Sequence, residues 1–321
     1  IRSVRERFPD AYIACLTAER CREILELNPS LNDIMIYDEQ GRHRSMLGKI
    51  RLIAELRQKK FDTVILVHRS FTRALLVALA GIPRRIGYRT KKRSALLTDK
   101  IEQPIEQMHR VDYFLSLGEP LGAATGKREY EFFISENDRL VVAKRLAARG
   151  IGPSDFVAAI NPGGNWEPKR WPKENFALLA DALVKRFGAK IVITGAKRDI
   201  PLAGEIARAM GSAPLILCGE TTLKELGAVF ARATVVVAND SGPMHIAAAI
   251  GANTVALFGP THPEITGPIG RGRHLVVRVE PACEVPCYDL SCKDHRCMSR
   301  ITVAQVVAAI EKMLAHQTAE K

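Results

Sequence analysis

The sequence contains little that would place it in or across a membrane. It has no uninterrupted apolar run approaching the ~20 residues that a helix needs to cross a bilayer. It also opens without the basic segment, apolar run and cleavage pattern of a secretory signal. We therefore expect a soluble protein.

Several motifs of cofactor and metal chemistry are absent as well. No Gly-x-Gly-x-x-Gly fingerprint follows an expected strand, which argues against a nicotinamide or flavin cofactor. Neither an Asp-x-Asp pair nor a His-Glu-x-x-His motif occurs, so the usual carboxylate and zinc holders are missing. Aromatic residues make up only 6% of the chain, which disfavours a stacking surface for nucleic acid. We expect no cofactor, no metal dependence of the chemistry and no nucleic-acid partner.

The seven cysteines fall into two groups. Cys15, Cys21 and Cys218 are scattered in apolar contexts that suit reduced thiols, which favours a reducing compartment such as the cytoplasm. Four others are separated by three, four and four residues in a polar segment near His295, a spacing looser than that of paired Cys-x-x-Cys motifs. Structural zinc, disulfides and free thiols therefore remain open for Cys283, Cys287, Cys292 and Cys297.

Apolar runs rich in valine and isoleucine alternate with longer amphipathic stretches along the 321 residues. This alternation predicts strands and helices around parallel sheets, and the length allows two domains. In the first half we expect strands at Ala11–Leu16, Asp33–Tyr37, Thr63–Val67, Arg84–Tyr88 and Tyr130–Ile134. We expect helices at Leu47–Lys59, Thr72–Leu79 and Gln107–Leu115, and at Ile1–Phe8 the middle of a helix whose start precedes the chain.

The second half repeats the pattern. We expect strands at Phe156–Ile160, Lys190–Thr194, Leu215–Cys218, Thr234–Ala238, Thr254–Phe258 and Leu275–Val279. The clearest helices are expected at Glu174–Arg186, Leu202–Met210, Leu223–Ala231 and His245–Ile250.

The domain boundary is expected near Arg149–Ser154, where Gly150, Gly152 and Pro153 interrupt a helix. This gives domains at 1–150 and 151–321, with the final helix packing back on the first domain. The fold class is α/β, with two doubly wound, Rossmann-like domains facing each other across a cleft. A ligand is expected in that cleft, at the carboxyl ends of the strands.

The net charge of +12 is concentrated in the first half. Residues 1–150 carry 28 Lys and Arg against 19 Asp and Glu, a net charge of +9, which leaves +3 for the remainder. Such a density predicts a surface that attracts an anionic, phosphate-bearing ligand, with a solvated loop as the alternative. Six basic residues stand within ten positions: Arg84, Arg85, Arg89, Lys91, Lys92 and Arg93.

Three loops in the second half each follow an expected strand at its carboxyl end, where an open parallel sheet binds its ligand. The first loop runs from Asn161–Gly164 into Lys169–Pro172. Its two glycines allow backbone amides to approach an anion, and Lys169 with Arg170 adds positive charge. A plain strand-to-helix turn is the alternative.

The second loop is Thr194–Asp199. Gly195 allows the chain to leave the strand tightly. Asp199 either caps the next helix or accepts a hydrogen bond from a ribose hydroxyl.

The third loop, Asn239–His245, leads into a helix of small residues. Pro243 suits the first turn of that helix, whose unpaired amides favour a phosphate. The alternative is a helix that is only capped, with His245 in the core. The residues expected around the helix start are Asp240, Ser241 and Gly242. We expect the three loops to cradle a pyrophosphate together.

Taken together, Asn161–Pro172, Asp240–His245 and the following Phe258–Thr261 resemble glycosyltransferase family 9, the family of ADP-heptose lipopolysaccharide heptosyltransferases. The Cys283–Met298 segment is similar to the cysteine-bearing tail of heptosyltransferase II-like members. The likeness covers nearly the whole chain, because it extends into the first half through Phe61–Ile65, Arg84–Tyr88 and His109.

The resemblance implies a GT-B fold with a donor site in the second domain and an acceptor surface on the first, formed by the basic cluster. Asp199 matches a ribose-holding acid, although some members have Glu there, and Thr221 matches a position beside the adenine. Lys169, Asp240 and His245 form the expected catalytic set. The donor-binding residues carried over are Gly163, Gly164, Lys169, Asp199, Thr221, Asp240, Ser241, Gly242 and His245.

The implied activity is inverting, metal-independent transfer of heptose from ADP-heptose to the anionic lipopolysaccharide inner core. We expect the protein in the cytoplasm, in peripheral contact with the inner face of the membrane. The family's general base would precede Ile1, and His68 is a weak substitute, so without that segment we expect donor binding with little transfer. The alternatives are a sugar-nucleotide epimerase of GT-B architecture and a non-catalytic nucleic-acid-binding protein.

Overall fold

The computed structural model describes residues 1–123, 128–280, 283–287, 289 and 291–318, with side chains as far as residue 315. The chain divides into two compact units, unit 1 at Ile1–Arg128 and unit 2 at Glu129–Lys321. The division therefore lies earlier than the expected join near Arg149. The reason is helix α6 (Glu136–Ala147), which packs against α9 (Leu223–Arg232) and so belongs to unit 2.

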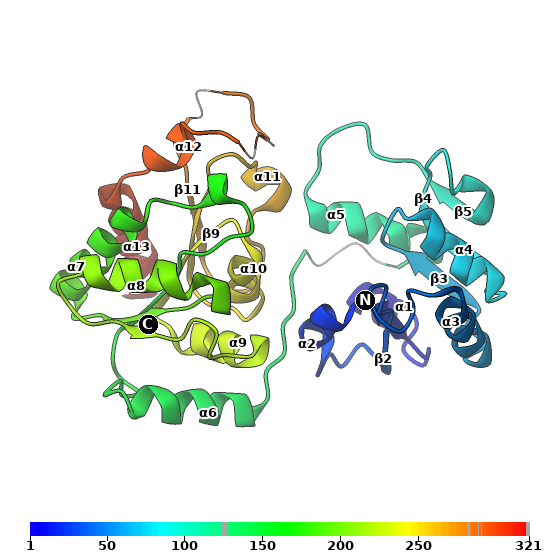
Figure 1. Cartoon of the computed structure of the whole chain (residues 1–321), viewed down its shortest axis with the longest axis horizontal. Helices are drawn as coiled ribbons and strands as arrows, with labels where there is room; N and C mark the ends of the chain where they lie inside the picture. Colours follow the sequence, from blue (N-terminus) through cyan, green and yellow to red (C-terminus); the bar gives the residue numbers. More distant parts are fainter. Residues whose placement is uncertain (124–127, 281–282, 288, 290, 319–321) are drawn as a thin grey trace. The chain divides into compact units, whose positions relative to one another are not determined.

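Unit 1 is built from short parallel strands in two sheets, drawn in blue and cyan in Figure 1. β1 pairs with β2, while β3, β4 and β5 form the second sheet in that order. Within the described residues, no helix of either unit is long and apolar enough to cross a membrane. The strands are β1 (Ala14–Thr17), β2 (Asp33–Ile36), β3 (Thr63–Leu66), β4 (Arg84–Tyr88) and β5 (Asp99–Ile101), and the helices are α1 (Arg2–Arg7), α2 (Arg22–Leu25), α3 (Met46–Gln58), α4 (Phe71–Leu79) and α5 (Arg110–Leu115).

Helices α3 and α4 cover the core of unit 1. The Ser45 hydroxyl caps α3 by accepting a hydrogen bond from the Gly48 N–H at 3.1 Å, and Ser70 caps α4 in the same way. Leu52 and Leu56, one turn apart, form the buried face of α3. The rest of this core contains Tyr37, Leu66, Ala74, Leu76, Val77, Ala80, Ile82 and Leu97.

Unit 2 contains a six-stranded parallel sheet with the order β11-β10-β9-β6-β7-β8. From β6 the chain runs outward through β7 and β8 on one side, and from β9 through β10 and β11 on the other. The strand order therefore reverses between β6 and β9, as in a doubly wound sheet. The strands are β6 (Val157–Asn161), β7 (Lys190–Ile193), β8 (Leu215–Ile216), β9 (Val235–Asn239), β10 (Thr254–Leu257) and β11 (His274–Val277), and the further helices are α7 (Lys173–Phe187), α8 (Ile200–Ala209), α10 (Gly242–Ala249), α11 (Pro263–Thr266), α12 (Arg296–Ser299) and α13 (Val303–Thr318).

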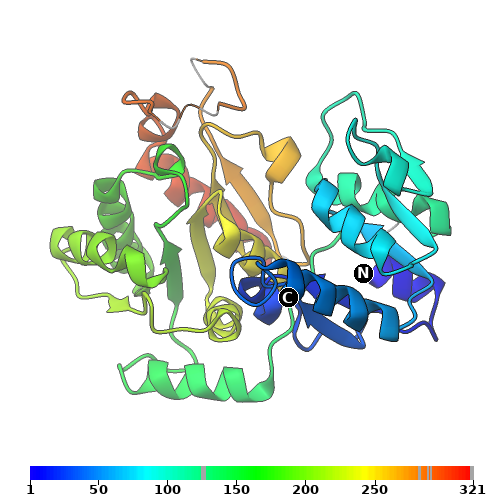
Figure 2. The same cartoon turned by 45° about the vertical axis from the view of Figure 1, so that its right-hand side comes forward.

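The sheet of unit 2 lies between two layers of helices, which Figure 2 shows from a second side. Successive strand residues point to opposite faces. Ile160 and Val237 pack under α7, α8 and α13, whereas Ala159 and Val236 pack under α6, α9 and α10. Because both faces are covered, the central strands are continuous apolar runs. Helix α13 packs against α7, β10 and β11 of its own unit, and its return to the first domain stays a prediction.

Two elements differ from the sequence expectation. Tyr130–Ile134 is not a strand but packs Phe132 against α9, where a Cβ on Gly227 would lie 2.6 Å from the Phe132 ring. Its alternating apolar residues serve this docking rather than a sheet. Strand β5 was not expected, because Asp99 and Lys100 occupy two of its three positions.

Candidate active site

The loops after β6 and β9 meet at the point where the strand order of unit 2 reverses, which is the usual ligand position in such sheets. Asn239, the last residue of β9, is fully buried and joins the two loops. Its Nδ2 donates to the carbonyl oxygens of Pro162 and Gly163 at 2.9 and 3.2 Å. Its Oδ1 accepts a hydrogen bond from the Trp171 N–H at 3.1 Å. Asn239 thus fixes both ends of the loop that carries Lys169.

Lys169 and Asp240 form the charged centre of this junction. Nζ of Lys169 lies 2.7 Å from Oδ2 of Asp240, and the same oxygen accepts a hydrogen bond from the Thr261 hydroxyl at 2.7 Å. The Asp240 side chain is 5% exposed and that of Lys169 is 19% exposed. The ammonium also lies 4.8 Å from the centroid of the Trp166 ring. A buried carboxylate therefore holds a partly exposed ammonium in a defined place.

Helix α10 begins at this junction without a side-chain cap. Ser241 occupies the N-cap position, and its Oγ is buried with no hydrogen-bond partner among the described residues. Gly242 opens the first turn, and apart from its chain neighbours and the backbone of its own helix, no heavy atom lies within 4 Å of the place where its Cβ would be. The unpaired amides of a helix start carry partial positive charge and bind anions. An orphaned hydroxyl, an open glycine and a helix start therefore converge beside Lys169.

Asp199 lies at the start of α8 and caps its own turn. Its Oδ2 accepts a hydrogen bond from the Ala196 N–H at 2.9 Å, and the residue is 6% exposed. A Cβ on Gly163 would lie 2.7 Å from this oxygen, and one on Gly195 would lie 2.9 Å from the Asp199 Cβ. The two glycines thus allow the loops after β6 and β7 to meet around the carboxylate. Asp199 is the N-cap residue of α8, but its side chain makes no capping hydrogen bond to that helix, and contact of Asp199 with a ribose stays a prediction.

His245 lies on α10 beside Tyr130, a residue that the sequence analysis did not single out. The two rings meet edge to face with centroids 5.4 Å apart. Burial, reinforced by the negative charge of Asp240, raises the pKa of the Tyr130 phenol. Tyr130 therefore borders the charged centre, and its assignment to a strand hid it. Thr261 was also missed, although it stands in a segment that carried the family resemblance.

The remaining expected donor residues lie along the same edge of the sheet. The carbonyl oxygen of Gly164 accepts hydrogen bonds from the Arg170 guanidinium at 3.1 and 2.7 Å, so Arg170 shapes the loop. Thr221 is half-buried and precedes Thr222, the N-cap residue of α9. It follows β8, two strands away from β6, and so lies apart from the charged centre.

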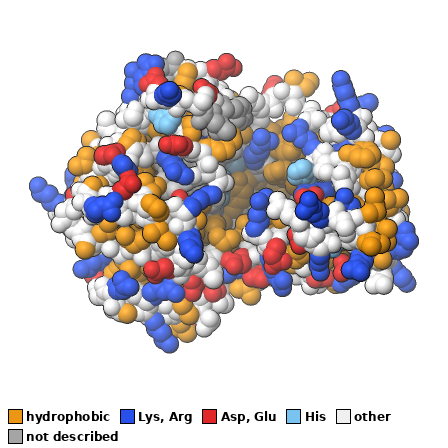
Figure 3. Space-filling view, viewed as in Figure 1, with side chains coloured by type: hydrophobic (Ala, Val, Ile, Leu, Met, Phe, Trp, Pro, Cys, Tyr) orange, Lys and Arg blue, Asp and Glu red, His pale blue; other side chains and the backbone are white. Residues whose placement is uncertain are grey.

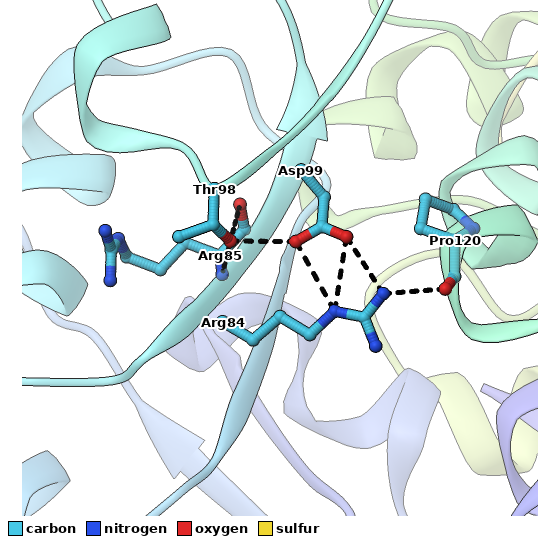
Figure 4. A network of polar contacts seen from close by, with 5 residues as sticks. All are labelled: Arg84, Arg85, Thr98, Asp99 and Pro120. Atoms are coloured by element: carbon cyan, nitrogen blue, oxygen red, sulfur yellow. Dashed lines mark hydrogen bonds and ion pairs between the residues drawn. The ribbon is translucent and has the colours of Figure 1, made fainter.

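Much of the basic cluster of unit 1 is engaged within that unit. Figure 4 shows the Arg84 guanidinium between Asp99, at 2.8 Å, and the carbonyl oxygen of Pro120, at 2.7 Å. The hydrogen bond from Arg84 lowers the pKa of the Asp99 carboxyl. Arg85 donates to the carbonyl oxygen of Leu96 at 2.7 Å. These two arginines therefore tie β4 to its neighbours, which the charge density alone did not reveal.

Arg93 requires a correction, because it does not belong to an exposed surface. It is fully buried, and its guanidinium donates to the carbonyl oxygens of Tyr88 at 2.7 Å and of His68. Burial lowers the pKa of this guanidinium. An arginine enclosed by backbone carbonyls is a structural residue rather than a ligand contact. The exposed members of the cluster are Arg89, which pairs with Glu102, and Lys91 and Lys92.

The cysteines are all unpaired thiols in this structure. Burial, followed by the neighbouring thiol of Cys283, raises the pKa of Cys297. Within the described residues, no group of three or more His, Cys, Asp or Glu side chains is arranged to hold a metal ion. No disulfide joins Cys283, Cys287, Cys292 and Cys297 in this structure, and the choice between structural zinc and free thiols stays a prediction.

Two parallel α/β units, with the strand order reversing between β6 and β9 in unit 2, are typical of glycosyltransferases of the GT-B fold, a class confirmed by solved structures. The glycosyltransferase family 9 structure from Veillonella parvula covers 98% of this chain and 92% of its own, with 26% identity and a TM-score of 0.89. The structure of Escherichia coli ADP-heptose lps heptosyltransferase II covers 99% of this chain and 93% of its own, with 26% identity and a TM-score of 0.81.

The chain belongs to glycosyltransferase family 9 (heptosyltransferase), whose family model matches residues 49–294. All the expected site residues lie within this range. Lipopolysaccharide heptosyltransferase 2 of Escherichia coli K12 is 27% identical over 99% of this chain and 94% of its own length. Lipopolysaccharide heptosyltransferase 3 of the same strain is 31% identical over 81% of this chain and 77% of its own length. The resemblance inferred from the motifs is thereby confirmed.

Proposed function

We propose that this protein transfers heptose from ADP-heptose to the lipopolysaccharide inner core as an inverting, metal-independent glycosyltransferase. It would act in the cytoplasm, at the inner face of the membrane. The observation that carries the proposal is the Lys169 ammonium beside the uncapped start of α10, where the strand order of unit 2 reverses. The relatives named as lipopolysaccharide heptosyltransferases support the choice of sugar and acceptor.

The diphosphate of the donor would lie against the start of α10. There the backbone amides after Ser241 and the orphaned Ser241 hydroxyl supply hydrogen-bond donors. Gly242 leaves room for the phosphate to approach the backbone. Lys169 supplies the full positive charge that a diphosphate requires. The adenosine would extend along the sheet edge toward Asp199 and Thr221.

Catalysis would come from the charge that develops on the departing ADP. As the bond between the anomeric carbon and the diphosphate breaks, negative charge grows on the phosphate oxygens. Lys169 and the amides of α10 stabilise that charge more strongly in the transition state than in the bound donor. One such preorganised donor group is typically worth about 10²–10³ in rate. This arrangement supplies the role that a bound cation would otherwise have, which is the basis for proposing metal independence.

Asp240 and His245 would position the reacting groups. Asp240 is held by Thr261 and in turn holds Lys169, so it orients the ammonium toward the phosphates. His245 lies on the first turn of α10, where its ring packs against that of Tyr130, and these two rings would border the sugar of the donor.

The acceptor would be recruited by unit 1. The recruiting surface would consist of Arg89, Lys91 and Lys92, which are the exposed members of the cluster. The other arginines are less exposed and are bonded within unit 1. Positive charge there would steer an anionic inner core to the enzyme. Its hydroxyl would attack the anomeric carbon from the face opposite ADP, which inverts the configuration.

The decisive experiment compares donor-induced shifts in melting temperature. ADP-heptose should raise the melting temperature more than UDP-glucose does, because a ligand stabilises the folded state according to its affinity. Equal shifts would remove the ADP-heptose assignment. Product analysis separates the epimerase alternative, since an epimerase converts a nucleotide sugar without an acceptor. Tighter, strongly salt-dependent binding of RNA than of ADP-heptose would favour the nucleic-acid alternative.

A further inference from the structure

Exposed apolar side chains are concentrated in unit 1. Among the described residues, fourteen of the eighteen large apolar side chains that are exposed lie within Ile1–Arg128. Three of them share the first turns of α3: Met46 is 72% exposed, Leu47 69% and Ile50 53%. We call these three residues the α3 patch. Adjoining apolar residues of this size seldom remain in water without a partner.

The α3 patch is not an uncovered part of the core. α3 already buries Gly48, Leu52 and Leu56 on one face, at the spacing of a helical stripe. Successive residues of a helix are rotated by about 100°, which directs Leu47 and Ile50 away from that face. The helix therefore has two apolar faces, and only one of them is covered by unit 1.

The surroundings of the patch are strongly basic. Residues 42–60 contain seven Lys and Arg and one acidic residue, Glu55. Arg44 and Arg51 are exposed on either side of the patch along the chain. Figure 3 shows hydrophobic side chains next to Lys and Arg side chains over the surface of unit 1. Apolar residues bordered by arginine and lysine are typical of helices that lie in the headgroup region of anionic membranes.

The loop before α3 presents this patch on a fixed base. The Asp38 carboxylate accepts hydrogen bonds from the N–H groups of Gly41 and Arg42 at 2.8 and 2.9 Å. Nδ1 of the buried His43 accepts a hydrogen bond from the Asp38 N–H at 3.0 Å. A rigid start of the helix lowers the entropy lost when its side chains enter another phase.

We propose that the α3 patch docks on the surface of an anionic phospholipid bilayer, with Met46, Leu47 and Ile50 inserted between headgroups and Arg44 and Arg51 on lipid phosphates. The proposal rests on the proposed function, in which the enzyme acts at the inner face of a membrane. A second copy of the chain is disfavoured as the occupant, because a twofold contact would bring the same basic residues together.

The test is binding of the full chain to vesicles of phosphatidylethanolamine and phosphatidylglycerol, measured by co-sedimentation. Leu47→Ser with Arg51→Gln should weaken binding about tenfold or more, since one leucine and one charge near the surface both contribute. The matched control is Leu178→Ser with Lys185→Gln on α7, which removes a leucine that is 59% exposed and one charge from unit 2. The control should bind as the wild type does.

Several outcomes would overturn the proposal. The first is an equal loss of vesicle binding in the two double variants. The second is wild-type binding to phosphatidylcholine vesicles that is as strong as binding to the anionic vesicles. The third is a wild-type dimer that the α3 variant converts to a monomer. Both variants must keep the melting-temperature shift caused by ADP-heptose, and loss of that shift in the α3 variant would instead place the patch in the donor site. If the wild type shows no such shift, the proposed function fails while the vesicle comparison still stands.

Discussion

Nζ of Lys169 lies 2.7 Å from Oδ2 of Asp240, where the loops after β6 and β9 meet. The pair places an ammonium beside the open start of α10 and at the same time balances its charge with a buried carboxylate. Under the proposed function, a donor diphosphate would share Lys169 with Asp240. This sharing would keep the lysine in place before the donor arrives and would limit how tightly the ground state is bound.

Replacing Lys169 by alanine should weaken donor binding and nearly abolish transfer. A charge-assisted hydrogen bond is worth about 1.5–3 kcal/mol, so the dissociation constant for ADP-heptose should rise about 10- to 100-fold. Asp240 loses its cationic partner, and the melting temperature of the free variant should fall as well. The readout is therefore the shift caused by ADP-heptose relative to each variant's own baseline.

Lys173→Ala is the matched control for this prediction. Lys173 stands on α7, where it pairs with Glu205, and its side chain is 46% exposed. Removing an exposed ion pair of this kind costs at most about 1 kcal/mol. If the Lys173 and Lys169 variants lose the ADP-heptose shift equally, Lys169 is not a donor contact.

The sequence predicted the parts of this site that depend on local pattern. The apolar runs of β6 and β9 located the two strand ends, and the residues just beyond them, Gly163 and Ser241, lie at the switch point as expected. This succeeds because doubly wound sheets place all carboxyl strand ends on one edge. Fold class and family followed from the same motifs and are confirmed.

Tertiary partners could not be predicted in this way. Arg93 looked like the rest of the basic cluster, yet it is enclosed by carbonyl oxygens that come from β4 and from the end of β3. Tyr130 stands between Glu129 and Glu131, in an alternation like that of a strand, yet it packs on His245. In both cases one partner, His68 for Arg93 and His245 for Tyr130, is distant along the chain. Composition and periodicity carry no information about such partners.

Gly163 and Gly164 should differ in their tolerance of alanine. A Cβ on Gly163 would lie 2.7 Å from the Asp199 carboxylate, whereas the nearest contact for one on Gly164 is at 3.7 Å. Gly163→Ala should therefore cost about 1–3 kcal/mol of unfolding free energy and displace Asp199. Urea denaturation measures the difference, with Gly164→Ala expected near the wild-type stability. Equal stability of the two variants would contradict the close packing of Gly163 on Asp199.

Substitutions of Arg93 and Lys92 should distinguish a structural role from an acceptor-binding role. Arg93→Met removes a buried guanidinium from the carbonyl oxygens of Tyr88 and His68, which should destabilise the protein by about 2–4 kcal/mol. Lys92 lies on the exposed surface, so Lys92→Gln should leave the unfolding free energy within about 0.5 kcal/mol of the wild-type value. Under the proposed function, only Lys92→Gln raises the acceptor KM without loss of stability. The reverse pattern would reassign the two residues.

His43 should make the stability of the protein fall in mild acid. The residue is buried in the loop before α3, and burial lowers its pKa below the ordinary value of about 6.5. As the pH drops below that value, the unfolded chain binds a proton that the folded state resists, so the free energy of unfolding decreases with falling pH. His43→Asn keeps an acceptor for the Asp38 N–H and removes the titration. Urea unfolding curves are measured at about seven closely spaced pH values between 7.5 and 5. The free energy of unfolding should decline less steeply with falling pH in the variant than in the wild type. An unchanged decline would mean that the neutral His43 ring is not what stabilises this loop.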